Sequence, residues 1–304
     1  MRWALYEAAQ AARRPGSPDR AYYDQAVVSS PRTRDKGREM EYEAVAEQVD
    51  GIPHMTREQG RKIYDHIRAT RPTSVLEIGT ANAVGTSYIA AALEANGDGR
   101  VVSVDRTTAS YEPGPEKVLA EVGLAHRIEL IRNPDSSYNW WLKKRIVARS
   151  DSAGYTEPVY DLVYLDGAHA WNIDGLAAVL VEKLLKPGGW LVLDDMDWSY
   201  ATSPTLAASP PADLSEEELR EPHMRLVFEL LLKPHPAFAE FRDDGEWGWA
   251  RKAPGAQRLL TLTVETKTRR AAGPGKARAA TAKAAPTSSV GLTAPRVNGA
   301  LSTA

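Results

Sequence analysis

Short runs of apolar residues alternate with amphipathic stretches through the middle of the chain. The apolar runs are SVLEIG (74–79), VVSVD (101–105), RIELIR (127–132), YDLVYLD (160–166) and WLVLDD (190–195). Helical periodicity fills the intervals, at about 84–95, 115–122, 138–148 and 172–185. Uninterrupted apolar strands are typical of a parallel sheet that is covered on both faces. The pattern therefore predicts an α/β domain of five parallel strands with helical crossovers.

Further elements flank this core. A helical stretch from Met40 leads to Gly51, and Thr56 is positioned to cap a helix that we expect to run through His66. Residues 215–232 have the pattern of one more helix. The segment 238–252 has the pattern of a hairpin that turns at Asp243-Asp244-Gly245, which would add an antiparallel edge to the sheet. Residues 258–265 are compatible with one further strand.

Composition divides the chain into three parts. Residues 1–40 are interrupted by proline and glycine and are expected to be an irregular or partly helical extension, and residues 41–266 form the predicted domain. Residues 267–304 are expected to be a disordered basic tail with seven Lys or Arg and no Asp or Glu. Because the whole chain carries −2, residues 1–266 carry −9, which argues against a nucleic-acid partner.

The chain has no cysteine, so disulfides and thiolate chemistry are excluded. The N-terminus lacks the apolar core of a signal peptide, and no apolar run approaches the roughly 20 residues that span a membrane. Cytoplasmic localisation without a membrane partner is the simplest interpretation. The oligomeric state stays open, with a homodimer as one alternative.

Polar residues at the strand ends are the candidate site, because ligands of such sheets bind at the carboxyl ends of the strands. These residues are Glu77 and Gly79, Asp105, 133–136, Asp166, and Asp194 with Asp195. The small residues from Gly79 to Gly85 would allow backbone amides to approach a ligand, although a tight turn explains them equally well. Asp105 follows Gly79 by 26 positions, about where an acidic residue accepts hydrogen bonds from ribose hydroxyls.

Four segments carry a family resemblance. EIGTANAVGTSYIA, VVSVD, YDLVYLDGAHAW and LLKPGGWLVLDDMDW, within about residues 50–250, resemble the class I S-adenosylmethionine-dependent methyltransferases. The resemblance extends to small-molecule O-methyltransferases of the catechol, caffeoyl-CoA and macrocin type. It implies a Rossmann-like, mostly parallel seven-stranded sheet of order 3-2-1-4-5-7-6 with helices on both faces. It also implies S-adenosylmethionine as cofactor and a small hydroxylated acceptor such as a sugar, phenol or secondary metabolite.

The resemblance also assigns cofactor-binding roles, which it places on these residues: Glu77, Gly79, Thr80, Ala81, Gly85, Asp105, Arg106, Asp135, Ser136 and Asp166. In this scheme the residues of the first turn line the methionine end, Asp105 holds the ribose, and Asp135 with Ser136 lies near adenine. Ala83 departs from the family pattern, since many relatives have glycine there. Met55 and Thr56 would belong to a lid.

Metal and proton-transfer chemistry are expected beside the cofactor. Asp166, Asp194 and Asp195 match the carboxylates with which metal-dependent relatives bind Mg²⁺, and oxygen ligands suit that ion. The alternative is that Asp194 and Asp195 only cap backbone amides. His169 lies three residues after Asp166, so His169 and Asp166 are the expected catalytic pair. Aromatic candidates for the acceptor wall are Trp140, Trp141, Trp171, Trp198 and Tyr200.

Two other functions stay open. An N-methyltransferase acting on a small molecule is the nearer alternative, although Asp166-Gly167-Ala168-His169 replaces the Asn/Asp-Pro-Pro-aromatic motif of adenine and glutamine N-methyltransferases. The other is a cofactor-binding relative of the cephalosporin-hydroxylase type without transferase activity, because fold alone does not fix function. A nucleic-acid methyltransferase is disfavoured by the acidic body of the chain.

Overall fold

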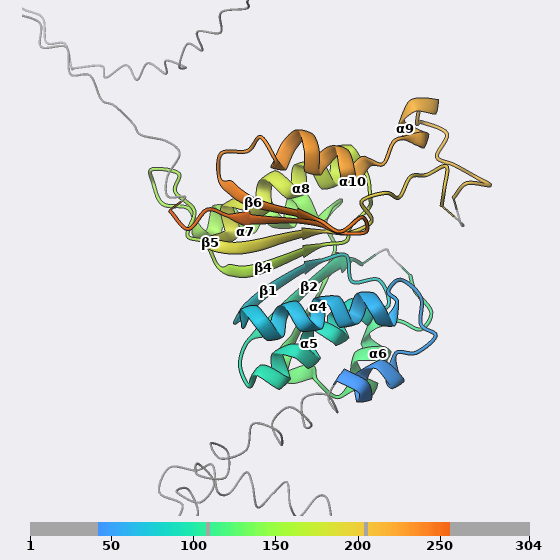
Figure 1. The fold of residues 1–304 in the computed structure, drawn as a ribbon, viewed down its shortest axis with the longest axis vertical. Helices are drawn as coiled ribbons and strands as arrows, with labels where there is room; N and C mark the ends of the chain where they lie inside the picture. The colour runs from blue at the N-terminus through green and yellow to red at the C-terminus, as the bar shows by residue number, and fades with distance from the viewer. Residues whose placement is uncertain (1–41, 108–109, 204–205, 256–304) are drawn as a thin grey trace, which may run out of the picture. The chain divides into compact units, whose positions relative to one another are not determined.

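Seven strands form one sheet in the computed structural model, which describes residues 42–107, 110–203 and 206–255 (Figure 1). Their order is β3-β2-β1-β4-β5-β7-β6, as predicted. The strands are β1 (Ser74–Ile78), β2 (Arg100–Arg106), β3 (Ile128–Asn133), β4 (Tyr160–Leu165), β5 (Leu185–Leu193), β6 (Phe238–Asp243) and β7 (Gly248–Lys252). β1 to β5 pair in parallel, whereas β7 is antiparallel to β5 and to β6. The expected extension, tail and strand at 258–265 lie outside the described residues.

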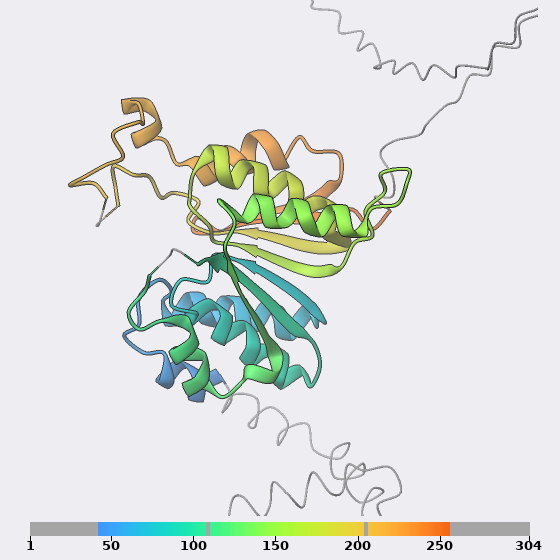
Figure 2. The ribbon, with the colours of Figure 1, turned by 180° about the vertical axis from the view of Figure 1, so that it is seen from behind.

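Helices cover both faces of the sheet, because its central strands alternate apolar side chains between two cores (Figures 1 and 2). On β4, Leu162 and Tyr164 pack into one core, and Val163 and Leu165 into the other. The first core is closed by α4 (Arg57–Thr70) and α5 (Val84–Asn96), and the second by α7 (Tyr138–Arg149) and α8 (Trp171–Leu184). Because these strands bury side chains on both faces of the sheet, their sequences are continuous apolar runs.

The helix boundaries follow local capping signals. Thr56 caps α4 and forms a capping box with Gln59, and the helix ends where Arg71 takes a left-handed conformation, beyond the predicted end at His66. α5 ends at Gly97, and α6 (Pro115–Val122) begins with proline and ends at Gly123. Residues 42–48 are also helical, in agreement with the stretch expected from Met40.

Two sequence predictions need correction. The single helix expected over 215–232 is instead three pieces, α9 (Glu216–Arg220), α10 (His223–Leu226) and the π-helical η2 (Val227–Leu232). Pro222 explains the break, because proline lacks the amide donor and disfavours helical geometry in the residue before it. β5 begins at Leu185 and not at Trp190, and its pairing with β4 is irregular between Tyr160 and Leu162.

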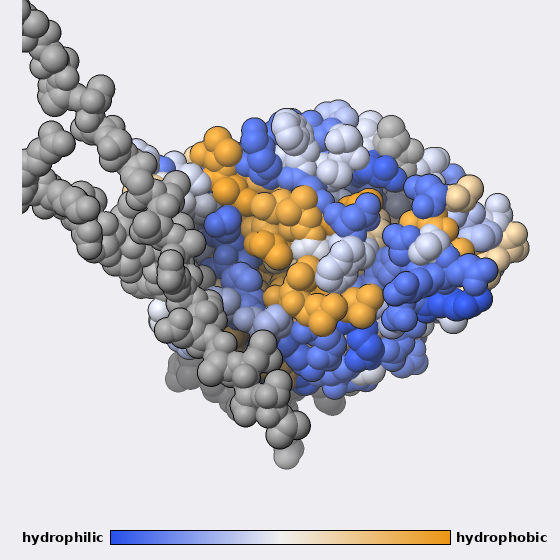
Figure 3. All heavy atoms as spheres, turned by 90° about the horizontal axis from the view of Figure 1, so that it is seen from above, coloured by the Kyte–Doolittle hydropathy of each residue, from blue (hydrophilic) through white to orange (hydrophobic). Residues whose placement is uncertain are grey.

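The helix layer that contains α8 also presents apolar residues to the surface. Leu176 of α8 and Leu230 of η2 have exposed fractions of 50% and 60%. Figure 3 views the molecule from this side and shows apolar residues gathered on it. Within the described part of the chain, no helix combines the length and the apolar character needed to cross a bilayer.

Candidate functional site

A cavity of about 410 Å³ lies at the carboxyl ends of β1, β2, β4 and β5, where the sheet topology predicts a ligand site. Ten of the residues expected from the sequence line it: Gly79, Ala81, Asp105, Arg106, Ser136, Asp166, His169, Asp194, Asp195 and Trp198. Its volume falls in the range of about 300–1,000 Å³ that is usual for small-molecule sites.

The turn after β1 needs glycine at its first position. Gly79 has φ +93°, and a Cβ built there would lie 1.6 Å from the carbonyl oxygen of Asp166. The Gly79 amide donates to the Val104 carbonyl of β2 at 2.9 Å. The backbone of this turn is therefore held against the ends of β2 and β4. Because Gly79 has no side chain, none fills the cavity where the turn meets these strand ends.

Asp105 joins the end of β2 to this turn. Its carboxylate accepts hydrogen bonds from the backbone amides of Ala81 at 3.0 Å and Arg106 at 2.6 Å. The side chain is largely buried yet lines the cavity. Each carboxylate oxygen has a second lone-pair direction, so Asp105 can accept a ligand hydroxyl while it fixes the turn.

Unusual backbone conformations concentrate around the cavity. Among the described residues, six non-glycine residues have positive φ, and five of them belong to the cavity wall or its first turn: His54, Ala81, Ala83, His169 and Asp195. Such conformations are costly for residues with a Cβ and are found most often at functional sites. Ala83, where relatives have glycine, takes φ +68° as the residue that precedes α5.

Three predicted cofactor residues lie behind the cavity wall and not on its surface. Glu77 is 1% exposed and accepts hydrogen bonds from Thr86 and, at 2.5 Å, from Ser103. Thr80 bonds the same Ser103 hydroxyl at 2.6 Å. A Cβ at Gly85 would come within 2.7 Å of the Glu77 carboxyl. These residues shape the first turn from within.

Burial raises the pKa of Glu77 to about 8, so stability should depend on pH. Because this pKa lies above the ordinary value of 4.5, the folded state retains a proton that the unfolded state loses, and the free energy of unfolding falls as pH rises from about 4.5 to 8. Glu77→Gln keeps an acceptor oxygen for both hydroxyls and should remove on the order of 3 kcal/mol of this fall. Urea unfolding at pH 5 and pH 8 measures it.

The control for this prediction is Glu58→Gln, since Glu58 is an exposed carboxylate in the first turn of α4. Its substitution should leave the difference in unfolding free energy between pH 5 and pH 8 unchanged. An equal pH dependence in the wild type and in Glu77→Gln would contradict the assignment of a buried, protonated carboxyl to this position.

The segment after β3 contributes less than expected. Asp135 is not a lining residue and forms an ion pair with Lys144, with both carboxylate oxygens at 2.8 Å. Asn133 holds the loop by accepting from the Asp135 amide and donating to the Ser137 carbonyl. Ser136 and Ser137 are the residues of this segment that line the cavity.

His169 lies between two of the expected acids. Its Nε2 is 3.1 Å from Asp166 Oδ1 and 3.5 Å from Asp195 Oδ2. Burial alone would lower the pKa of His169, but the hydrogen bond and charge of Asp166, with the charge of Asp195, raise it to about 9. An ionised carboxylate has no proton to donate, so Nε2 carries the hydrogen in this arrangement.

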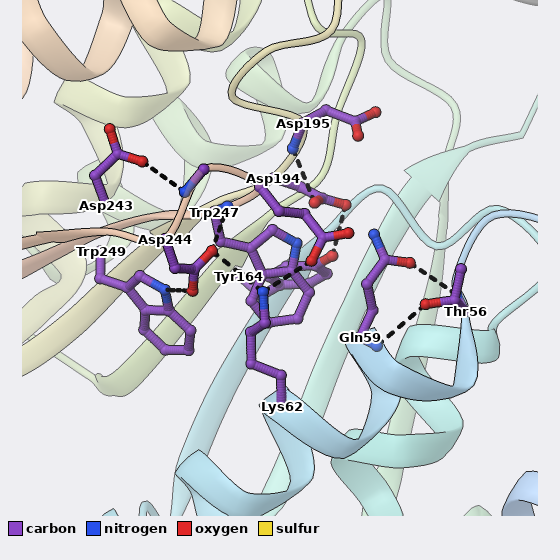
Figure 4. A network of polar contacts seen from close by, with 12 residues as sticks. Thr56, Gln59, Lys62, Tyr164, Asp194, Asp195, Asp243, Asp244, Trp247 and Trp249 are labelled. Atoms are coloured by element: carbon purple, nitrogen blue, oxygen red, sulfur yellow. Dashed lines mark hydrogen bonds and ion pairs between the residues drawn. The ribbon is translucent and has the colours of Figure 1, made fainter.

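Asp194 turns inward from the same group. It is 3% exposed, and its carboxylate accepts from the Tyr164 hydroxyl at 2.7 Å and from the Asp195 amide at 2.8 Å. Figure 4 shows the Asp194 side chain directed at Tyr164, with the Asp195 carboxylate pointing away from it. Burial and the neighbouring carboxylates raise the pKa of Asp194 well above its usual range.

This arrangement does not fit the expected metal site. Within residues 42–107, 110–203 and 206–255, no three Asp, Glu or His side chains converge as ligands of one ion. The His169 ring nitrogen lies between Asp166 and Asp195, and Asp194 uses its oxygens within the protein. The cap of the Asp195 amide by Asp194 is the alternative that the sequence left open.

A buried pair fixes the loop that carries His169. The Tyr138 hydroxyl donates to the Asp174 carboxylate, which also accepts from the Ala170 amide at 2.9 Å, and the Ala168 amide donates to Tyr138 at 3.2 Å. A Cβ at Gly167 would come within 2.4 Å of both polar groups. The loop is therefore fixed on both sides of His169.

Some lining residues were missed by sequence reasoning. His54, Gln59 and Tyr111 line the cavity from outside the strand ends, and the rings of His54 and Tyr111 are 5.8 Å apart. Burial, followed by the charge and hydrogen bond of Asp105, raises the pKa of Tyr111 to about 12. These residues belong to no sequence motif. The only indication in the sequence was that they lie near the residues of α4 or β2 along the chain.

The aromatic residues expected at the acceptor wall and the residues expected in a lid lie in different places in the structure. Trp198 lines the cavity and packs on His169 with ring centroids 5.2 Å apart. Trp140 and Trp171 are 51% and 38% exposed on their helices. Met55 is buried in the first core, and Thr56 caps α4.

Comparison with solved structures returns proteins of the same fold. A protein from Staphylococcus aureus, provisionally assigned as a caffeoyl-CoA O-methyltransferase, is 16% identical with a TM-score of 0.50, over 73% of this chain and 99% of its own. The O-methyltransferase TomG from Streptomyces achromogenes, in complex with SAM, is 18% identical with a TM-score of 0.46, over 77% and 95%. The likeness to the Staphylococcus aureus protein, at 16% identity, shows the fold alone.

Sequence comparison gives a family match. Curated protein sequences gave no significant match. Residues 76–196 match the sequence model of a family described as a methyltransferase domain. This stretch runs from β1 to the acids after β5 and so includes every strand whose end borders the cavity. Residues 76–196 are therefore similar to a methyltransferase domain, and the strand order is the one that the sequence resemblance implied.

Proposed function

We propose that this domain transfers a methyl group from S-adenosylmethionine to a hydroxyl oxygen of a small acceptor. The observation that carries the proposal is the cavity wall made by the Gly79 turn and the Asp105 carboxylate at the ends of β1 and β2. A glycine turn without room for a Cβ, followed by an acid that accepts hydroxyls, suits the amino-acid and ribose parts of this cofactor.

The charge of the cavity supports the same cofactor. Its acidic residues are Asp105, Asp166, Asp194 and Asp195. Burial raises the pKa of Asp194 so that it holds its proton, and the other three carboxylates outnumber the two cations, Arg106 and protonated His169. Such a surface favours a ligand that carries positive charge. S-adenosylmethionine, when bound, supplies a methyl group attached to a positively charged sulfur. After the transfer, this sulfur remains in the product as a neutral thioether.

The acceptor would enter on the side of His54, Gln59 and Trp198. Transfer requires the acceptor oxygen to lie in line with the methyl group, and positioning accounts for much of the acceleration in such reactions. The hydroxyl loses its proton as the oxygen–carbon bond forms. We assign the neutral form of His169 to accept this proton through Nδ1, because the carboxylates of Asp166 and Asp195 keep the hydrogen on Nε2. Since the pKa of His169 is raised to about 9, we expect the rate of transfer to rise with pH up to about that value.

Calorimetric titration with S-adenosylmethionine tests the proposal first. We expect one site per chain, and no binding by the wild type would contradict the proposed function. A panel of sugars, phenols and amines, incubated with methyl-labelled cofactor, then distinguishes the acceptors by product mass. Label found only on amine nitrogen would replace O-methylation by the N-methyltransferase alternative.

A further inference from the structure

We propose that the His169 imidazole takes the place of a divalent cation between Asp166 and Asp195, so that this chain works without a bound metal ion. The proposal concerns side chains of the described residues and goes beyond the proposed methyl transfer, on which it does not depend. Its physical basis is the position of Nε2, 3.1 Å from Asp166 Oδ1 and 3.5 Å from Asp195 Oδ2.

A bridging ion and an imidazole N–H cannot occupy the same position between the two carboxylates, because a ring nitrogen that carries a hydrogen is not a metal ligand. Mg²⁺ requires oxygen ligands at about 2.0–2.1 Å in octahedral geometry. To bridge Asp166 and Asp195, such an ion would lie where the N–H of His169 now contacts both carboxylates. With the hydrogen on Nε2, the ring would have to leave this position before the ion could bind.

The surroundings oppose movement of the ring. His169 and Asp195 both have left-handed backbone, with φ +52° and +53°, which sets the direction of each side chain. Trp198 packs against the imidazole, and its own amide donates to the Asp195 carbonyl at 3.1 Å. The Tyr138–Asp174 pair anchors the amides of Ala168 and Ala170 on either side of His169.

Asp194, the third expected metal ligand, already accepts hydrogen bonds within the protein. Asp194 accepts from Tyr164 and from the Asp195 amide, and both donors lie inside the protein. Turning Asp194 toward an ion would leave the buried Tyr164 hydroxyl without that partner, which is unfavourable. Asp166, His169 and Asp195 therefore form a closed group of two acids bridged by one imidazole.

The proposal predicts a gain of metal binding when the imidazole is removed. Wild-type protein should not bind Mn²⁺ at concentrations up to about 1 mM, whereas His169→Ala, in which Asp166 and Asp195 face the space left by the ring, should bind one ion per chain below that limit. The added change Asp195→Asn should abolish the new site. Electron paramagnetic resonance of free Mn²⁺ measures binding directly, without an activity assay.

His54→Ala is the matched control, because His54 lines the same cavity but lies in the loop before α4. It should leave the wild-type absence of Mn²⁺ binding unchanged. Circular dichroism establishes that each variant is folded, and His169→Asn replaces His169→Ala if the latter unfolds.

Two results would overturn the proposal. One is a wild-type Mn²⁺ site that is lost in Asp195→Asn, since the ion would then displace the imidazole. The other is a folded His169 variant that gains no site. S-adenosylmethionine binding is measured in parallel in the presence of a metal chelator, which separates the metal proposal from the proposed function. If the cofactor does not bind, methyl transfer is contradicted, but the Mn²⁺ results still test whether His169 replaces the ion.

Discussion

Replacing Asp105 by alanine should weaken S-adenosylmethionine binding by at least about tenfold. The carboxylate faces the cavity from the end of β2, where Ala81, Arg106 and Tyr111 donate to it and one further acceptor position is left for a ribose hydroxyl. Each charge-assisted hydrogen bond contributes about 1.5–3 kcal/mol, and each 1.4 kcal/mol corresponds to a tenfold change in affinity. Calorimetry on the folded variant measures the loss.

Two further variants give this measurement its meaning. Asp105→Asn retains one acceptor oxygen and should lose less affinity than Asp105→Ala. Asp135→Ala removes an acid that sequence similarity also assigned to the cofactor, but Asp135 pairs with Lys144 and does not line the cavity. We expect Asp135→Ala to bind within about twofold of the wild type, because a contact that is not made contributes no binding energy. Equal losses at both positions would argue against the proposed ribose contact.

Gly79→Ala should destabilise the fold by about 3 kcal/mol or more. The added methyl group would meet the backbone carbonyl of Asp166 at 1.6 Å, and φ +93° is unfavourable for any residue with a Cβ. Backbone at the end of β4 cannot move aside without disturbing its pairing with β1. The free energy of unfolding in urea measures the effect.

Gly123→Ala provides the comparison, since Gly123 has φ +75° but nothing within 4 Å of its added Cβ. It carries only the left-handed backbone penalty, about 1 kcal/mol. The difference between the two variants isolates the clash with Asp166. If Gly79→Ala were no less stable than Gly123→Ala, the close approach of the two strand ends would be wrong.

The core elements were predictable because burial dictates them. β1, β2, β3 and β4 begin and end within one residue of the apolar runs, since strands buried on both faces carry little else. The start of β5 was missed because Lys186 to Gly189 lack the apolar pattern of a strand, although the strand extends through them from Leu185, which pairs with Tyr160. The break at Pro222 could have been read from proline chemistry, but the apolar periodicity on either side masked it.

The site was predictable where strand ends define it. Asp105, Asp166 and Asp195 follow directly from topology, because parallel strands end at one edge. Side-chain direction does not follow from topology: Glu77 points inward and Asp135 points toward Lys144. His54 and Tyr111 come from loops whose course depends on tertiary packing, and their conformations have no sequence period.

The reversal of direction at β7 determines where a reporter group can be attached. β7 starts beside Leu193, next to the cavity, and runs antiparallel to β5. The described chain therefore leaves the sheet at the amino ends of the parallel strands, away from the cavity. Because the sequence contains no cysteine, Gly255→Cys would introduce the only thiol in the protein. A dye attached to this exposed turn would lie at the end of the sheet opposite the cavity, where it would not contact a ligand bound there.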